Sequence, residues 1–318
     1  MKLAQLAEKG GFRYAWVPDD SPTPPFGETF VSLAAIALAT TRLHVGSSLC
    51  NPYTRNPALI ASAALALHDL SRSKAIIGLG VGSAYLLEKI GLPNWVSPYA
   101  TLKNAVTVIR RLLEGETVTF ESGVFKLNAV KLSKSKIRLP IYVGARGPRL
   151  LDLAGRIADG VLLAARANEQ LPQVIQLVKK GASAAGRSLK SIDMTNSLVI
   201  STDEDRPKAR RAARLTCAYI IAWASSEAVE AVGIKSRDRA RVAEALAKGR
   251  EEEAAAAVTD LMIDKYTISG TPGDCVERCM DQIEMGIDHL IFCEPFGPNP
   301  EKAVNLIGKK IIPGLVAS

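Results

Sequence analysis

The segment Gly144-Ala145-Arg146-Gly147 is the part of the sequence best suited to hold an anion. It follows a short apolar run, residues 141–143, and precedes a helix-like run that begins at Arg149. Backbone N–H groups at a helix start, the helix dipole and a guanidinium all attract a negatively charged group. An ordinary strand-to-helix turn with a solvent-exposed arginine would use the same residues. From the residues alone, phosphate binding and a plain turn both stay open.

A second stretch suited to ligand contact opens from an apolar run into Gly46-Ser47-Ser48-Leu49-Cys50-Asn51. Small residues at the end of a strand let another molecule approach the backbone closely. Pro52 and Pro57 then restrict the chain to extended or turn geometry before a helical pattern at 58–70. This stretch could also be an ordinary strand-to-helix connection.

Two further strand ends carry residues that could do chemistry. Asp19 and Asp20 follow the strand-like run 14–17, and the run 75–79 leads into Gly80-Val81-Gly82. Gly78, Gly80 and Gly82 resemble half of a dinucleotide-binding fingerprint. The third glycine would have to stand at Ser83, and no well-placed acidic residue follows the next strand, so a Rossmann fold is a poor interpretation.

The elements that must position these loops alternate between short strands and helices along almost the whole chain. Seven strands are expected near residues 14, 43, 75, 141, 160, 194 and 289. We predict an α/β fold, a single (β/α)8 TIM barrel over 1–318, because such barrels take about 250 residues and two insertions account for the remainder. The insertions are a hairpin with a basic loop at about 115–140 and a helical segment at about 205–268. The first strand has no counterpart, and because an unpaired edge is costly we expect a lost or misassigned amino terminus.

Ligands bind at the carboxyl ends of barrel strands. That rule brings the candidate loops to one mouth, namely Asp19 and Asp20, residues 47–51, 80–83, 144–147 and 164–166. Each loop is weak evidence when taken alone. Their placement at one end of a barrel is stronger evidence, and it predicts an active site there.

Composition supports a globular enzyme of this kind. The chain has 318 residues, of which 47% are hydrophobic and only 5% aromatic, as expected for helices packed on buried parallel strands. No apolar run is long enough to span a membrane and the amino terminus lacks a signal peptide pattern, so we expect a cytoplasmic protein with no membrane partner. Five cysteines without a Cys-x-x-Cys pair and three scattered histidines predict neither a disulfide framework nor a metal site.

A net charge of +8 suggests affinity for anions. Two basic clusters contribute much of it, one at Lys131, Lys134, Lys136 and Arg138, the other at Arg206, Lys208, Arg210, Arg211 and Arg214. Aromatic residues are not interleaved with either cluster, so no nucleic-acid partner is expected. A solvated face or a phosphorylated or polycarboxylate ligand accounts for the charge.

Several motifs together carry a resemblance to a known family. They are Gly10-Gly11-Phe12 with Tyr14-x-Trp16, Asn51-Pro52-Tyr53, Gly78-x-Gly80-x-Gly82, Gly144-Ala145-Arg146-Gly147-Pro148, Ala158-Asp159-Gly160-Val161 and Ser269-Gly270-Thr271-Pro272. With them the chain resembles the bacterial-luciferase-like (β/α)8 superfamily, and within it the deazaflavin-dependent methylenetetrahydromethanopterin reductases. The resemblance implies coenzyme F420, which passes a hydride between its C5 and a substrate carbon, and one-carbon metabolism on a tetrahydropterin carrier.

The same resemblance assigns roles to the candidate residues. Asp19 matches an acidic residue after the second strand and is the catalytic candidate. Ser48-Leu49 matches a bulge with a non-prolyl cis peptide behind the deazaflavin ring. The expected cofactor-binding residues are Ser48, Leu49, Cys50, Asn51, Gly80, Val81 and Gly82, with Gly144, Ala145, Arg146 and Gly147 at the cofactor's phosphate. This sequence departs from the family pattern at Asp20, where histidine is usual, at Ser83, where an acid is frequent, and at the first strand, whose carboxylate has no counterpart.

We therefore carry three hypotheses. The first is an F420-dependent oxidoreductase acting on a tetrahydropterin-linked one-carbon unit or a related small molecule. The second is a flavin mononucleotide (FMN) monooxygenase of the same superfamily, and the third is a catalytically silent relative that binds a cofactor or partner. A homo-oligomer formed through packed helices is also expected.

Overall fold

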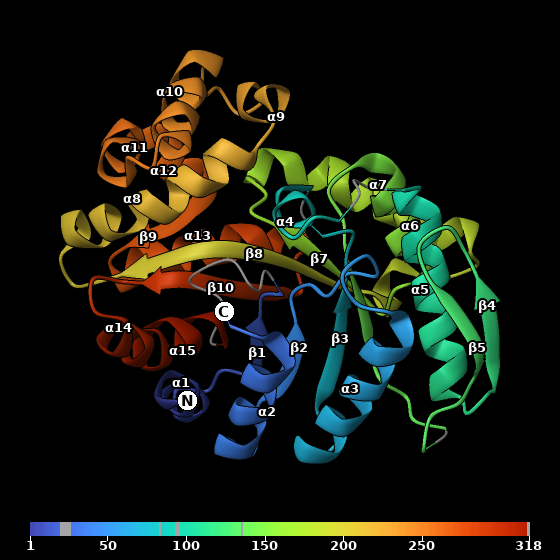
Figure 1. Ribbon diagram of the computed structural model, residues 1–318. Coiled ribbons are helices and arrows are strands. Elements are labelled where there is room, and N and C mark those ends of the chain that lie inside the picture. The colour runs from blue at the N-terminus through green and yellow to red at the C-terminus, as the bar shows by residue number, and fades with distance from the viewer. Residues whose placement is uncertain (20–26, 83, 93–95, 135, 317–318) are drawn as a thin grey trace.

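The central sheet of the computed structural model, which describes residues 1–19, 27–82, 84–92, 96–134 and 136–316, has eight parallel strands. One of them, β9 (Thr267–Gly270), pairs with β8 to one side, and the other seven form a single path. Their order is β1-β2-β3-β6-β7-β8-β10, so strands that follow one another in the barrel part of the sequence are neighbours in space (Figure 1). The strands are β1 (Tyr14–Val17), β2 (His44–Ser47), β3 (Ala75–Leu79), β6 (Ile141–Gly144), β7 (Gly160–Ala164), β8 (Asp193–Thr202) and β10 (His289–Phe296). All seven predicted strands are therefore present.

The sheet curls into a nearly closed barrel whose two ends are β1 and β10. Backbone pairing between these two strands is absent from the part of the chain that the structure describes. Side chains bring them together instead, because the Tyr14 ring lies 4.1 Å from the His289 ring, centroid to centroid. His289 Nδ1 is in turn 3.1 Å from Asp193 Oδ2 at the start of β8. An aromatic and polar contact thus spans the place where the predicted barrel lacks its first strand.

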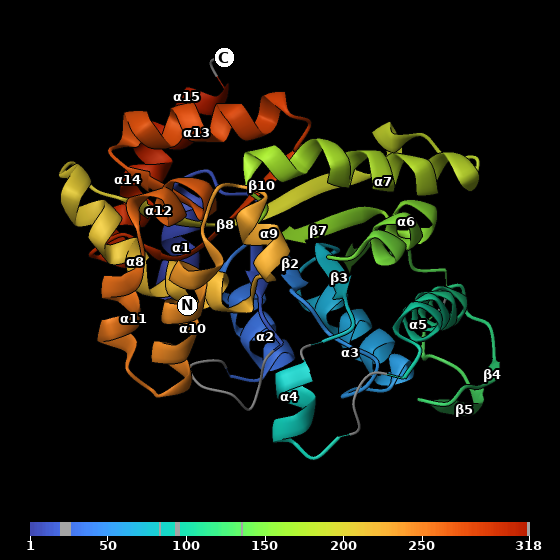
Figure 2. The ribbon, with the colours of Figure 1, turned by 90° about the horizontal axis from the view of Figure 1, so that it is seen from above.

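Helices cover the outside of the strands, as the alternating pattern predicts. Figure 2, viewed from above, shows α2, α3, α5, α6 and α7 following one another around the strands. The helices outside the large insertion are α1 (Lys2–Lys9), α2 (Thr29–Ala39), α3 (Pro57–Leu70), α4 (Ala84–Lys89), α5 (Pro98–Leu113), α6 (Pro148–Ile157), α7 (Leu171–Ala184), α13 (Pro272–Glu284), α14 (Pro300–Leu306) and α15 (Ile312–Val316). A π-helical turn, Ile307–Ile311, lies between α14 and α15. Within the described ranges, no helix is both long and apolar enough to cross a membrane.

Local sequence explains where these helices begin. Pro57 occupies the first turn of α3, and the Asn56 side chain caps it by accepting a hydrogen bond from Ala58 N at 2.9 Å. Thr271 caps α13 in the same way, with Pro272 directly after it. Strands β3 and β6 are buried along their whole length, because one face meets the barrel interior and the other meets the helices.

The two regions expected to be insertions contain the following elements, with one correction. The first contains the predicted hairpin, β4 (Val118–Glu121) antiparallel to β5 (Lys126–Val130). The second comprises α8 (Arg206–Trp223), α9 (Ser226–Glu230), α10 (Ser236–Ala247), α11 (Glu251–Ala257) and α12 (Asp260–Tyr266). Its apolar residues form a core that it shares with Ala167 and with Val199 of β8. The expectation of helix through residue 268 is wrong at its end, because strand β9 (Thr267–Gly270) begins at Thr267 and pairs in parallel with β8.

Candidate functional site

The turn after β2 is the most unusual backbone feature at the carboxyl ends of the strands. The peptide bond between Ser48 and Leu49 is cis, as the family resemblance predicts. Directly after it the chain pairs with β3, because Cys50 N donates to Gly78 O and Gly80 N donates to Cys50 O, both at 2.9 Å. Leu49 is therefore a bulge between two paired residues.

The Leu49 side chain occupies space that two glycines leave open. A Cβ atom at Gly80 would lie 2.8 Å from Leu49 Cδ1, and one at Gly144 would lie 1.9 Å from the same atom. A side chain at either position would require Leu49 to shift. Gly80 and Gly144 come from different strand ends, so Leu49 joins the loops after β2, β3 and β6. The partly exposed side chain also packs with the barrel-interior group that includes Trp16 and Tyr142.

Asp19, the catalytic candidate, lies at the end of β1 and is 7% exposed. Its Oδ1 accepts a hydrogen bond from Thr29 Oγ1 at 3.0 Å and lies 3.9 Å from Arg55 Nη2. Its Oδ2 is buried without a hydrogen-bond partner among the described residues. Cys50 lies beside this carboxylate, and burial, followed by the Asp19 charge, raises the pKa of its thiol. One carboxylate oxygen is thus fixed and the other is available for a proton or a donor.

Asn51 and Gly82 form the next part of the mouth. The Asn51 side chain is fully buried, and its Oδ1 accepts hydrogen bonds from Tyr53 N at 3.2 Å and Thr54 N at 3.0 Å. Its Nδ2 has no partner in the described ranges and would lie 2.9 Å from a Cβ atom at Gly82. Gly82 has φ +67°, a conformation that glycine adopts readily. Glycine thus suits this position both because of its backbone conformation and because a Cβ atom would be too close to Asn51. Val81, between Gly80 and Gly82, is partly exposed.

The loop after β6 has the predicted strand-to-helix geometry. Gly144 ends β6, Ala145 is buried, and Gly147 is the N-cap of α6, whose first residue is Pro148. The Arg146 side chain is exposed, and it makes no ion pair with a carboxylate in the described part of the chain. Although the side chain is exposed, the protein atoms around it remove part of the hydration of the guanidinium and lower its pKa. The loop can therefore present a free cation beside a helix N-terminus.

Sequence reasoning placed residue 166 at the mouth but assigned it no role. In the structure Arg166 Nη2 donates to Arg146 O at 2.7 Å, which brings the loop after β7 against the loop after β6. Arg166 is itself held by the fully buried Asn196 of β8. An asparagine inside the strand predicted near residue 194 was the signal that could have indicated this contact.

The predicted residues therefore meet at one end of the barrel, as far as they are described. Asp19, the turn 47–51, Gly80 and Gly82, and the loop 144–147 are linked by the contacts of Asp19, Leu49 and Asn51 given above. Asp20 and Ser83, where this sequence departs from the family pattern, lie outside the described residues.

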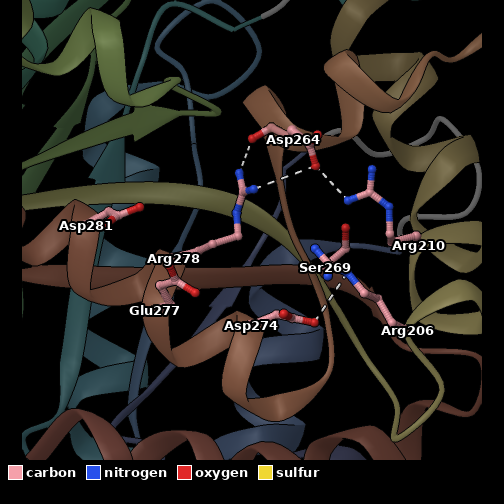
Figure 3. Close-up of a pocket in the computed structure, with 8 residues that line it drawn as sticks. All are labelled: Arg206, Arg210, Asp264, Ser269, Asp274, Glu277, Arg278 and Asp281. Atoms are coloured by element: carbon pink, nitrogen blue, oxygen red, sulfur yellow. Dashed lines mark hydrogen bonds and ion pairs between the residues drawn. The ribbon is translucent and has the colours of Figure 1, made fainter.

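A hollow of about 300 Å³ lies between α8, α12 and α13, and none of the residues that line it belongs to these loops (Figure 3). It is lined by three arginines and four acidic residues, of which Arg210 and Asp264 are paired at 2.6 Å. Arg206 Nε lies 3.5 Å from Asp274 Oδ2 across the same hollow. Part of the second basic cluster is thus paired with acids, as expected for a solvated face.

Comparisons with known proteins agree on one group of relatives. A family model described as luciferase-like monooxygenase matches residues 1–289. The chain is 36% identical to the 5,10-methylenetetrahydromethanopterin reductase of Methanolobus tindarius over 97% of this chain and 94% of that protein. It is also 36% identical to the protein of the same name from Archaeoglobus fulgidus, over 98% of this chain and 94% of that protein.

A solved structure extends the likeness to the whole fold. The coenzyme F420 dependent tetrahydromethanopterin reductase from Methanopyrus kandleri matches with a TM-score of 0.93 and 31% identity, over 99% of this chain and 94% of that one. An F420-dependent secondary alcohol dehydrogenase matches with a TM-score of 0.80 and 22% identity, over 99% and 93% of the two chains. The second match is a likeness of fold alone.

Proposed function

Because the chain belongs to the luciferase-like family, we propose that it is a coenzyme F420-dependent oxidoreductase that reduces 5,10-methylenetetrahydromethanopterin. The observation that carries this proposal is the 36% identity, over nearly the full length of both chains, to reductases of that name. The likeness to the Methanopyrus kandleri reductase supports it, because the strands and loops of the mouth are part of the shared fold.

The residues at the mouth fit a ligand rich in donors and acceptors. Asp19 Oδ2, Asn51 Nδ2 and Arg166 Nε are buried without hydrogen-bond partners among the described residues. They follow β1, β2 and β7 respectively, at the carboxyl ends of these strands. A buried polar atom without a partner costs about 1–3 kcal/mol. A bound cofactor and substrate that pair with these atoms would remove that cost.

The deazaflavin supplies hydride transfer at its C5, and the chain supplies position and electrostatics. Leu49, with the backbone of Ser48 and Cys50, would support the apolar ring and exclude water from one side of it. The loop 144–147 would hold the phosphate through backbone N–H groups and Arg146. Asp19 would hold or release a proton at Oδ2, the oxygen that Thr29 leaves free.

The test is an assay of the purified protein with reduced F420 and methylenetetrahydromethanopterin, following the return of oxidised deazaflavin absorbance. We expect turnover that depends on both substrates. Reduced FMN in place of reduced F420 is the control, and no turnover is expected with it. The proposal is wrong if the purified protein retains FMN and not F420. It is also wrong if the protein oxidises reduced F420 at the same rate with and without the pterin.

We also propose a homo-oligomer formed through the outer face of α2 and α3. Val31 and Leu38 of α2 are 70% and 72% exposed, and Leu59 of α3 is 62% exposed. Helix α2 contains no charged residue, so this face is complementary to a second copy of itself. Light scattering coupled to gel filtration should give more than one copy for the wild type and a single copy for Leu38→Glu. A monomeric wild type would contradict the proposal.

A further inference from the structure

Two arginines lie side by side at the mouth without a counterion. Arg166 Nη2 donates to the backbone oxygen of Arg146 at 2.7 Å, so the Arg166 guanidinium rests on the loop that carries the Arg146 guanidinium. Within the described ranges, neither guanidinium has a carboxylate within 4.0 Å, whereas most arginines of α8 do. Arg166 Nε is in addition buried without a partner. Two cationic side chains are thus gathered here with no carboxylate among the described residues to neutralise them.

Buried polar side chains fix Arg166 in this position. Asn196 Oδ1 accepts from Arg166 N at 3.1 Å, and Asn196 Nδ2 donates to Arg166 O at 3.0 Å, so one amide clamps both sides of the residue's backbone. The same Nδ2 lies 2.8 Å from Gln282 Oε1 of α13, and Gln282 Nε2 donates to Asn168 Oδ1. Asn196 is fully buried and Gln282 is 3% exposed. A linked set of buried amides of this kind holds a backbone rigidly.

The backbone before Arg166 is also held in an unfavourable conformation. Ala165 has φ +48°, in the left-handed region that non-glycine residues seldom adopt. Its N–H donates to Ser197 O at 2.8 Å, which ties the turn to β8. Residues in such conformations cluster at ligand-binding sites, where the surrounding structure maintains them. Both the clamp and the turn therefore serve to direct residue 166 toward the loop after β6.

We propose that Arg166 is a second anion-binding residue, which together with Arg146 binds the negatively charged phosphate-bearing tail of the cofactor. Burial, with the Arg146 charge added to it, lowers the pKa of the Arg166 guanidinium, so a bound anion would favour its charged form. Asn196 is a positioning residue, because it acts through the Arg166 backbone. The inference rests on the proposed function, since it assigns the anion to the deazaflavin cofactor.

The test compares binding of two deazaflavins by fluorescence quenching. One is F420, with its phosphate and glutamyl tail, and the other is the deazaflavin chromophore that lacks phosphate and tail. We expect Arg166→Gln to weaken F420 binding by about 10- to 100-fold, the value of a lost hydrogen bond to a charged group, and to leave chromophore binding unchanged. Arg166→Lys, which keeps the charge, should recover part of the loss. Asn196→Ala should weaken F420 binding in the same selective way.

Arg187→Gln is the matched control. Arg187 also donates to backbone oxygens, those of Gly155 and Ala158, but it lies after α7, away from the mouth. The control should bind both deazaflavins as the wild type does. If Arg166→Gln does not fold, two other measurements test the proposal. Arg166→Lys should bind F420 more weakly than the wild type does, and inorganic phosphate should weaken F420 binding by the wild type.

The outcomes separate the two proposals. A wild type that binds neither deazaflavin contradicts the proposed function. A wild type that binds F420 while Arg166→Gln and Arg166→Lys bind it equally well contradicts the role of Arg166. A raised KM for the pterin substrate with unchanged F420 binding also overturns the inference, because the anion would then belong to the substrate.

Discussion

The contact between Leu49 and Gly144 leads to a sharp prediction about Gly144→Ala. The new Cβ would lie 1.9 Å from Leu49 Cδ1, 3.1 Å from Cγ and 3.2 Å from Cδ2, and these are its three nearest atoms. Leu49 must therefore move, and displacing a packed side chain costs about 1–3 kcal/mol. The backbone adds no penalty, because Gly144 does not have a positive φ. We expect the free energy of unfolding to fall by that amount.

A double-mutant cycle with Leu49→Ala isolates this contact. All three close atoms are absent from an alanine at residue 49, so Gly144→Ala should cost much less in that background. We expect a coupling energy of about 1–2 kcal/mol. The assay is urea unfolding of the four proteins, compared through midpoints at constant slope. Gly147→Ala is the control in the same loop, since nothing lies within 4 Å of its Cβ position. Gly147 is the N-cap of α6, where alanine is a poorer cap, so we expect a cost of about 1 kcal/mol that is the same with Leu49 or alanine at residue 49.

The reasoning would be refuted by additive effects of the two substitutions. Additivity would mean that the Leu49 side chain does not occupy the space over Gly144. A coupling between Gly147→Ala and Leu49→Ala would be equally damaging, because nothing lies within 4 Å of a Cβ atom at residue 147.

Three further predictions concern single groups. Asp19→Asn should lower kcat about 100-fold or more while the Kd for F420 stays unchanged, measured by steady-state kinetics and fluorescence, and an unchanged kcat would exclude the proton role. Asp274→Asn should cost about 1 kcal/mol at neutral pH, because it weakens the α13 cap. Burial alone would raise the Asp274 pKa, but hydrogen bonds from Thr271 outweigh it and lower the pKa. The stability that the Asp274 carboxylate contributes is present above its unfolded-state pKa and is lost as the pH falls through its folded-state pKa. The urea midpoints of Asp274→Asn and the wild type should therefore converge in acid. A difference between the midpoints that persists in acid would contradict this pH dependence. Burial raises the thiol pKa of Cys217 to about 12 and of Cys275 to about 11, so a thiol reagent should label both only after denaturation, and rapid labelling of the native protein would contradict their burial.

The barrel could be predicted from the sequence because buried parallel strands leave short apolar runs between helical patterns. All seven of these strands and the hairpin β4–β5 are where the runs predict them. Strand β9 was not predicted, because Thr267-Ile268-Ser269 is too short to show a strand pattern. It forms only because residues 199–202 of β8 offer it a partner, which is a tertiary effect.

The site could be predicted only in part, because contacts between distant residues decide its details, as they do for β9. The loops at the carboxyl ends of the strands follow from the fold, and the cis peptide at Ser48-Leu49 follows from the resemblance to the family. Which side chains meet there depends on residues that are distant in sequence. The packing of Leu49 over Gly80 and Gly144 leaves no local signal in composition or spacing, and the clamp of Arg166 leaves only a polar residue, Asn196, in a strand.

The packing of Leu49 changes how glycine variants at this mouth must be interpreted. Gly80 and Gly144 are predicted to contact the cofactor, yet both also make room for Leu49. A larger residue at either position would therefore reduce cofactor binding even if the glycine itself never touched the ligand. Loss of binding alone does not distinguish the two roles. If Leu49→Ala restores binding to Gly144→Ala, the glycine acts through Leu49, and if it does not, the Gly144 backbone is itself part of the cofactor site.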